Sequence, residues 1–272
     1  MSADLETDIR AAAVAGYDLV ELRSNKLYEY LESNTVDDLN ALLAETGIGV
    51  LSINTLEHIT WRSDEDYAAI KRECAHLCDI SRAIGCPYVL SVPGALRQGP
   101  KTEEETINES VRVLNELADI AEPYGVKIGF EFLGEGNNSV QTLDLGSKIV
   151  NLVGRDSVGN VMDTYHFYAG SSTFDAIDAL DPKKLFIFHI NDAEDLPKAE
   201  LNDSKRLYPG LGILPIAEIK EHLDGIGYDG PVSVEIFRPE YWEQDPFDVA
   251  KRAKAATEQT LGLGEYAAGG SW

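Results

Sequence analysis

The chain alternates short apolar segments with longer amphipathic ones, and this alternation limits the folds open to it. The clearest apolar segment, LFIF at 185–188, has no polar alternation, which is typical of a parallel strand covered on both faces. The full set of predicted strands is 18–23, 49–54, 88–92, 126–133, 158–164, 185–192 and 231–237. Helical patterns separate them at 3–15, 35–46, 63–84, from 102 onward, 142–152, 174–180, 216–223 and 247–261.

Repeated strand-helix units of this length indicate a parallel sheet, either closed as a TIM-type (βα) barrel or open and doubly wound. No GxGxxG follows the first strand, so the signature of a dinucleotide fold is missing and the barrel is favoured. Only seven strands are predicted, and the sequence begins with a helix where a closed barrel needs a first strand. We therefore expect either a start further upstream or a barrel with an open seam. No linker divides the chain, so residues 1–272 are predicted to form one barrel domain.

Charge and composition limit the partners. The sequence holds 47 acidic and 23 basic residues, a net charge of −24, which repels nucleic acid and anionic membranes. No apolar run reaches the length of a membrane span, and the first residues do not form a signal peptide. We therefore expect a cytoplasmic protein with a small-molecule substrate. Such an acidic surface also suggests a salt-rich cytoplasm, which is a hypothesis about the source.

The last four predicted strands each end in one side chain that can bind a metal: Glu131, Asp163, His189 and Glu235. Taken singly, each could be a loop charge or a hydrogen-bonded core residue. In a barrel, however, the four positions converge at the carboxyl-terminal mouth, where unpaired charges in an apolar setting call for a cation. Three carboxylates and an imidazole suit one divalent metal ion. We expect Mn²⁺ first, with Zn²⁺, Co²⁺ and Mg²⁺ as alternatives.

Several sequence blocks resemble a known superfamily. The pattern of Glu131, Asp163 with His166 three residues on, His189 and Glu235 is similar to that of the xylose isomerase-like TIM-barrel sugar isomerases and epimerases. Within that superfamily, the inosose (2-keto-myo-inositol) isomerases are the most similar branch. The blocks that carry this resemblance are DIAEPYGVKIGFEF, DTYHF, FHINDAEDLP, RLYPGLG and VSVEIFRPEYW. The resemblance runs from about Gly16 to the last helix and departs at the amino terminus.

The resemblance implies that the four side chains bind one divalent metal. It also implies an isomerase that moves the carbonyl of a keto-inositol or a related sugar through an enediolate. Glu131 and Glu235 are then the acid/base candidates, with His166 as a polar helper in catalysis. The substrate-binding candidates are Arg206, which lies inside a shared block, and the rim residues Trp61, Asn54 and Arg238.

Other functions remain open at this stage. A ketose 3-epimerase would use a similar metal set, but that group usually carries an arginine six residues after the histidine ligand, where this chain has Asp195. An inosose dehydratase would use the same metal to expel a hydroxyl. The DNA-repair endonucleases of the superfamily need more histidines than the five present and suit a charge of −24 poorly. A non-catalytic sugar-binding module is the alternative from another class. Barrels of this kind often form homo-oligomers, but the sequence shows no interface stripe.

Overall fold

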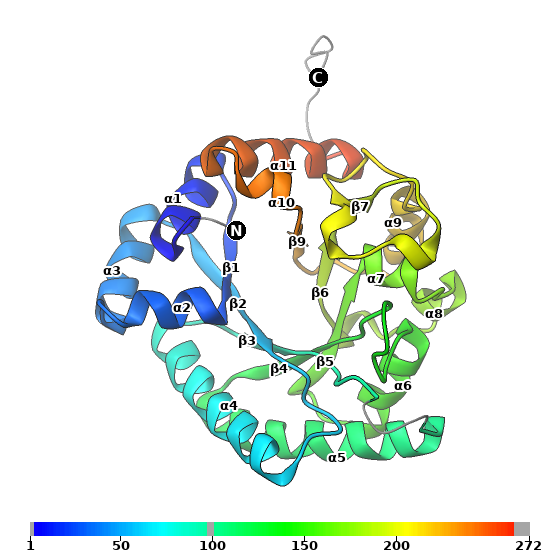
Figure 1. Ribbon diagram of the computed structural model, residues 1–272. Coiled ribbons are helices and arrows are strands. Elements are labelled where there is room, and N and C mark those ends of the chain that lie inside the picture. The colour runs from blue at the N-terminus through cyan, green and yellow to red at the C-terminus, as the bar shows by residue number, and fades with distance from the viewer. Residues whose placement is uncertain (1–2, 97–100, 264–272) are drawn as a thin grey trace.

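The structure, a computed structural model, describes residues 3–96 and 101–263. One parallel sheet curls into a nearly closed ring, with its strands in the order β1-β2-β3-β4-β5-β6-β9 (Figure 1). The strands are β1 (Leu19–Arg23), β2 (Gly49–Leu56), β3 (Tyr88–Ser91), β4 (Lys127–Glu131), β5 (Val158–Asp163), β6 (Leu185–Ile190) and β9 (Val232–Val234). A short antiparallel pair, β7 (Asp192–Ala193) and β8 (Arg206–Leu207), lies in the connection after β6. The predicted seven-stranded barrel is confirmed.

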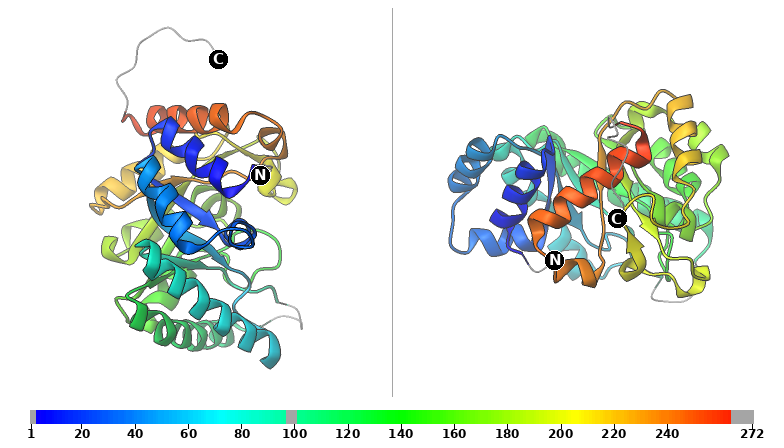
Figure 2. Two further views of the ribbon diagram at one scale, coloured as in Figure 1. Left: turned by 90° about the vertical axis from the view of Figure 1, so that its left-hand side faces the viewer. Right: turned by 90° about the horizontal axis from the view of Figure 1, so that it is seen from above.

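Helices form the outer layer around this ring (Figure 1). They are α1 (Leu5–Ala15), α2 (Ser24–Leu31), α3 (Val36–Thr46), α4 (Asp64–Ile84), α5 (Glu103–Ala121), α6 (Leu143–Val153), α7 (Thr164–Ala169), α8 (Phe174–Asp178), α9 (Ile216–Gly225), α10 (Pro239–Trp242) and α11 (Pro246–Leu261). Helix α11 packs beside α1, so the first and last helices are neighbours in the outer layer (Figure 2). None of the helices in the described part of the chain is long and apolar enough to cross a membrane.

Two apolar layers position the strands. The larger core lies between the sheet and the helices and includes Ile128, Phe130 and Met162. A smaller cluster fills the inside of the ring and includes Leu90, Val161 and Ile187. At Gly129 an added Cβ would come within 2.6 Å of the Leu90 side chain and 2.9 Å of Val161, so this inner position has no room for a larger residue. The inner layer thus fills the barrel below the ends of β4, β5 and β6.

The ring has a seam between β1 and β9. Strand β1 pairs only with β2, and β9 pairs only with β6. Within residues 3–96 and 101–263 the parallel sheet has no eighth strand between them. Side chains bridge the seam instead: Ser233 on β9 donates to Glu21 on β1, at 2.5 Å, and Asn54 on β2 donates to Glu235, at 2.9 Å. This matches the open-seam form of the sequence expectation.

Several elements differ from the prediction. Strand β9 covers 232–234, whereas the apolar pattern predicted 231–237, because this strand has a hydrogen-bonded neighbour on only one side. The segment 185–192 divides into β6 and β7, since the two-residue strand β7 turns to pair with β8. Helices α2, α7 and α10 were not predicted. Helices α2 and α7 each begin directly after a strand, with no loop to separate the two patterns, and α10 has only four residues.

Candidate metal centre and active site

The four side chains predicted to bind a metal meet at one point. Glu131, Asp163, His189 and Glu235 each offer one ligand atom, and these atoms all lie within 4.8 Å of one another. The first three end or nearly end β4, β5 and β6, and Glu235 follows β9 directly. Asp163 and His189 are also register partners on neighbouring strands. The carboxyl ends of parallel strands thus bring together residues that are more than 100 positions apart in sequence.

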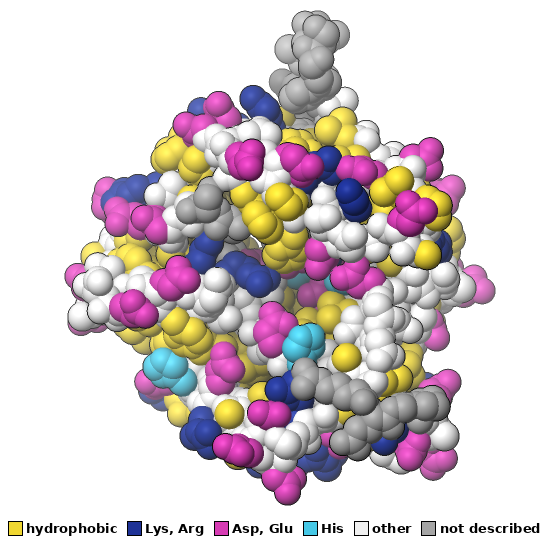
Figure 3. Space-filling model, in the orientation of Figure 1, with side chains coloured by type: hydrophobic (Ala, Val, Ile, Leu, Met, Phe, Trp, Pro, Cys, Tyr) yellow, Lys and Arg dark blue, Asp and Glu magenta, His cyan; other side chains and the backbone are white. Residues whose placement is uncertain are grey.

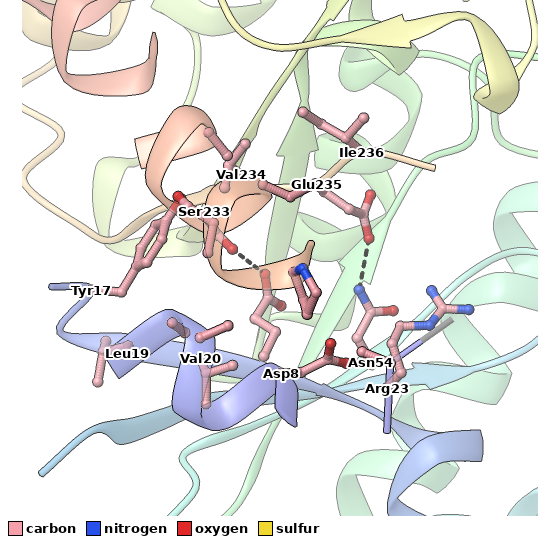
Figure 4. A pocket seen from close by; sticks show the side chains of 18 of the residues that line it. Asp8, Tyr17, Leu19, Val20, Arg23, Asn54, Ser233, Val234, Glu235 and Ile236 are labelled. Carbon is pink, nitrogen blue, oxygen red and sulfur yellow. Dashed lines mark hydrogen bonds between the residues drawn. The ribbon is translucent and has the colours of Figure 1, made fainter. Parts of the chain in front are cut away.

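The site is buried. The face of the molecule in Figure 3, seen along the barrel as in Figure 1, is hollowed near its centre. The side chains of Asp163 and His189 are fully buried, and that of Glu235 is 15% exposed. A cavity of about 410 Å³ borders the site on the seam side. Asn54, Ser233 and Glu235 face this cavity from β2 and the β9 region (Figure 4). Of the four metal-competent residues, only Glu235 lines this cavity, so the cavity reaches the site from one side.

Burial and neighbouring charges shift the pKa values of the three carboxyl groups in this site. Burial raises the pKa of Glu131 to about 7, and the nearby Glu235 and Asp163 add to the effect. Burial likewise raises the pKa of Glu235. Burial also acts to raise the pKa of Asp163, but Arg206, two nearby histidines and a backbone hydrogen bond together outweigh it and hold this pKa below its usual value. Two of the three carboxylates are therefore poised to hold a proton.

A divalent cation fits these residues. Three carboxylates and one imidazole form an oxygen-rich donor set that is typical of sites for Mn²⁺, Zn²⁺ and similar ions. The Nδ1 atom of His189 faces the other donors, at 3.1 Å from Oε1 of Glu131 and 3.7 Å from Oε2 of Glu235. The buried negative charge that raises the pKa of the two glutamates is what a cation would offset. The donor chemistry and the electrostatics of the site therefore both favour a bound divalent cation.

Arg206 is the nearest permanent positive charge. It is 1% exposed, and its Nη1 atom donates to Oδ2 of Asp163, at 2.9 Å, and to Oε2 of Glu235, at 3.1 Å. Its Nη2 atom donates to Nε2 of His166, at 3.1 Å. Burial lowers the pKa of His166 to about 4, so the imidazole is neutral and accepts this bond. Arg206 and His166 therefore form the wall of the site beside Asp163.

Two amides hold the carboxylates in place. Asn54 donates to Oε1 of Glu235, and the two side chains point toward each other in Figure 4. Asn191 donates to Oδ2 of Asp163, at 2.6 Å. Asp163 also accepts the backbone N–H of His166, at 2.8 Å, and so caps helix α7. The sequence singled out Asn54 as a substrate contact, but it did not give Asn191 a role.

Two of the predicted substrate-binding residues, Trp61 and Arg238, contact residues outside the metal-competent cluster. The backbone N–H of Trp61 donates to Glu109 on α5, and its ring lies against Lys101. Arg238 pairs with Glu194, at 2.6 Å, and with Glu240, at 3.3 Å. Within the described residues, neither side chain has a recorded bond to the four metal-competent groups. Both lie near the rim, outside the buried cluster.

Sequence reasoning missed Glu21. This residue of β1 accepts a bond from Nε2 of His189, with 3.0 Å between that atom and Oε1 of Glu21. Burial acts to raise its pKa, but His189 and two serine hydroxyls outweigh burial and lower the pKa of Glu21 to about 2. Burial acts to lower the pKa of His189, but the acids around it, Glu21 followed by Glu131 and Glu235, raise this pKa well above its usual value. The one available signal was an acid in the middle of a predicted strand.

Comparisons with known proteins agree with this geometry. Residues 9–260 match the family described as Xylose isomerase-like TIM barrel. The chain belongs to this family. It is 38% identical to the inosose isomerase of Bacillus velezensis over 96% of this chain and 93% of that protein. It is also 38% identical to the inosose isomerase of Bacillus subtilis, over 94% and 92%.

A solved structure of this xylose isomerase-like family matches along nearly the whole chain. It is a crystal structure of the IOLI protein with a binding zinc atom, with a TM-score of 0.93 and 37% identity over 96% of this chain and 94% of that one. A family member of this similarity thus binds a metal. In this chain a donor set suited to a divalent ion lies at the mouth of the barrel.

Proposed function

We propose that this chain is a metal-dependent isomerase that moves the carbonyl of a keto-inositol by one position, with 2-keto-myo-inositol as the first substrate to test. The observation that carries the proposal is the convergence of four ligand atoms within 4.8 Å at the mouth of a barrel. Relatives named inosose isomerase, at 35–38% identity, cover 94–96% of the chain and point to the substrate. The same chemistry applied to another ketose is the nearest alternative.

We propose that Glu131, Asp163, His189 and Glu235 hold the ion, and that Mn²⁺ serves in the cell because the set is rich in carboxylates. Zn²⁺, Co²⁺ and Mg²⁺ are the ions to compare. A divalent ion bound there would polarise the substrate carbonyl and stabilise the negative charge of an enediolate. Elemental analysis of the purified protein, followed by chelation and reloading with each ion, identifies the one that gives the highest turnover.

Two glutamates are placed to move the protons. Without a cation, burial raises the pKa of Glu131 to about 7, and a bound divalent ion would lower this pKa by offsetting the nearby negative charge. The Glu131 carboxylate would then be ionised at neutral pH and able to accept a proton from the substrate carbon. Glu235 offers a second carboxylate in the same cluster. One of them removes the α-proton, and it or the other returns a proton to the former carbonyl carbon. The proton of the α-hydroxyl passes to the oxygen that was the carbonyl. The carbonyl then moves to the next position of the ring.

Arg206 and His166 supply donors for substrate oxygens. The Nε atom of Arg206 and the Nδ1 atom of His166 are buried and have no hydrogen-bond partner among the described residues. A buried N–H without a partner is costly, and a hydroxyl or carbonyl oxygen of the substrate would satisfy each of them. Asn54 would orient Glu235 and reach the same ligand. Trp61 and Arg238 are proposed only for the outer part of the substrate, toward the rim.

The test is turnover of 2-keto-myo-inositol by the metal-loaded protein, followed by NMR in D₂O. Glu131→Gln and Glu235→Gln keep the size of the side chain but remove the proton acceptor. We expect each to lower kcat by about 10²- to 10⁴-fold, the usual contribution of an acid/base group. Glu218→Gln, which changes an exposed glutamate on α9, is the matched control and should turn over like the wild type.

The same assay separates the alternatives. Inversion at a carbon of a ketohexose without movement of the carbonyl would identify a ketose 3-epimerase, and loss of water would identify an inosose dehydratase. Binding without turnover would identify a sugar-binding module. Full activity in both glutamine variants would contradict the mechanism.

We further propose a cytoplasmic setting and a single barrel domain. The three cysteines, Cys74, Cys78 and Cys86, are buried free thiols, which suits a reducing compartment. The proposed domain, residues 1–272, includes positions outside the described ranges. A small polyol or keto-sugar is the expected partner. Light scattering of the purified protein would determine whether it forms a homo-oligomer.

A further inference from the structure

Glu21 lies on the opposite side of His189 from the metal-competent carboxylates. The Nδ1 atom of His189 faces Glu131 and Glu235, whereas its Nε2 atom faces Oε1 of Glu21, at 3.0 Å. The imidazole is thus held between the proposed metal site and a fourth acid. Glu21 comes from β1 and has no place among the four ligand atoms.

The carboxylate of Glu21 is itself held from two sides. Ser233 donates to its Oε1 atom, and Ser52 donates to its Oε2 atom, each at 2.5 Å. Ser52 is the register partner of Glu21 on β2, and Ser233 is the register partner of His189 on β9. The side chain of Glu21 is only 11% exposed. These contacts give the carboxylate one orientation, with Oε1 directed at the imidazole.

An imidazole can bind a cation through Nδ1 only when that nitrogen has a free lone pair. Its one remaining proton then lies on Nε2 and needs an acceptor, since the ring is fully buried. A carboxylate at this position fixes both the tautomer and the ring orientation, and it makes Nδ1 a better donor to the ion. Glu21 is the acceptor that the structure places there.

We propose that Glu21 is a positioning residue of the metal centre: it accepts the Nε2–H of His189 and so directs the Nδ1 lone pair at the bound cation. The inference rests on the proposed metal centre but not on the identity of the substrate. It also gives β1 a role in a site whose ligands come from β4, β5, β6 and the end of β9. Glu21 is not one of the four metal-competent groups, so its effect on the cation passes through His189.

The test uses the full chain loaded with Co²⁺, with three variants. Glu21→Ala removes the acceptor, Glu21→Gln keeps a carbonyl oxygen without the charge, and Glu218→Gln is the matched control. Co²⁺ affinity is measured by competition with a chelator. Proton NMR of the Co²⁺ protein reports the shifted, exchangeable Nε2–H of its single histidine ligand. A purely structural role for Glu21 would move neither measurement in a variant that folds like the wild type.

We expect Glu21→Ala to weaken Co²⁺ binding by about 10- to 100-fold, the usual effect of losing such a partner. Its Nε2–H signal should disappear through fast exchange with water. Glu21→Gln should lose less affinity and keep the signal, and Glu218→Gln should match the wild type. Wild-type affinity together with a retained signal in Glu21→Ala would overturn the proposal.

If Glu21→Ala does not fold, Glu21→Gln decides the question. A loss of at least about threefold in Co²⁺ affinity supports the proposal, and unchanged affinity overturns it. The outcome is separable from that of the proposed function. A wild type that binds Co²⁺ without turning over any inosose leaves the role of Glu21 in place, whereas a wild type that binds no Co²⁺ overturns both.

Discussion

At the scale of single residues, Arg206 lets buried acids lie close together. Its guanidinium contacts Asp163 and Glu235, and it lies over the rings of Tyr165 and Phe237. It also pairs with Asp203, at 2.8 Å. Removal of the arginine would leave two carboxylates buried without their permanent counter-charge. Such a loss is strongly destabilising in protein interiors.

Arg206→Ala should therefore lower the free energy of unfolding of the metal-free protein by about 3–5 kcal/mol. Urea unfolding in the presence of EDTA measures this change. Arg238→Ala is the control, because it removes ion pairs that are partly exposed to water and should cost less than about 1 kcal/mol. Equal losses in the two variants would show that the buried cluster does not depend on Arg206.

The metal-competent residues could be predicted from sequence because each ends an apolar strand, and the carboxyl ends of such strands meet in a barrel. Their convergence within 4.8 Å follows from that rule. Glu21 could not be predicted in the same way. It lies within its strand, and its two serine partners carry no chemical signal of their own. Its role depends on the strand register and on the seam, which only the structure shows.

At the scale of elements, most of the predicted helices begin at a side chain that caps them, whereas α8 and α9 were predicted without such a cap. Thr35, Ser63 and Thr102 each accept a backbone N–H at the start of α3, α4 and α5. Helix α2 has no side-chain cap at all. The cap of α7 is Asp163, which the sequence assigned to the preceding strand as a ligand. Cap residues thus helped to predict the starts of several longer helices, whereas the short helices α2, α7 and α10 were missed.

The capping box of α5 gives a prediction with a pH dependence. Hydrogen bonds from Thr102 lower the pKa of Glu105, whose carboxylate accepts the N–H of Thr102, at 2.8 Å. A carboxyl group with a lowered folded pKa stabilises the fold above its ordinary value of 4.5 and loses that effect as the pH falls through the folded value. Glu105→Gln should therefore destabilise the protein at pH 7, and its difference from wild type should shrink toward pH 3.

Urea unfolding at a series of pH values measures this difference. Glu104→Gln is the control. This exposed glutamate lies in the same first turn and interacts with the same helix dipole, but the capping box consists of Thr102 and Glu105. Thr102→Ala, which removes the other half of the box, should cost about 1 kcal/mol at pH 7. A pH-independent difference for Glu105→Gln would contradict the assigned role of its charge.

At the scale of the whole molecule, the seam shows what a sequence count can and cannot predict. Seven strand patterns predicted either an upstream strand or an open barrel, and the sheet indeed lacks a pair between β1 and β9. Which side chains would bridge the gap could not be read from sequence. The Ser233–Glu21 and Asn54–Glu235 bonds join residues 212 and 181 positions apart. Such pairs form only when the ring has closed.

The net charge of −24 gives the last prediction, which concerns the folded state as a whole. Like charges repel more strongly in the compact form than in the unfolded chain, and dissolved salt screens that repulsion. Raising KCl from 0.05 M to 2 M should therefore stabilise the protein. We expect the thermal midpoint to rise by at least about 4 °C, which corresponds to roughly 1–2 kcal/mol for a domain of this size.

Because the Debye length is already about 10 Å at 0.1 M, simple screening should be nearly complete below 0.5 M. A rise that continues toward 2 M would support adaptation to a salt-rich cytoplasm, and an unchanged midpoint would contradict both explanations.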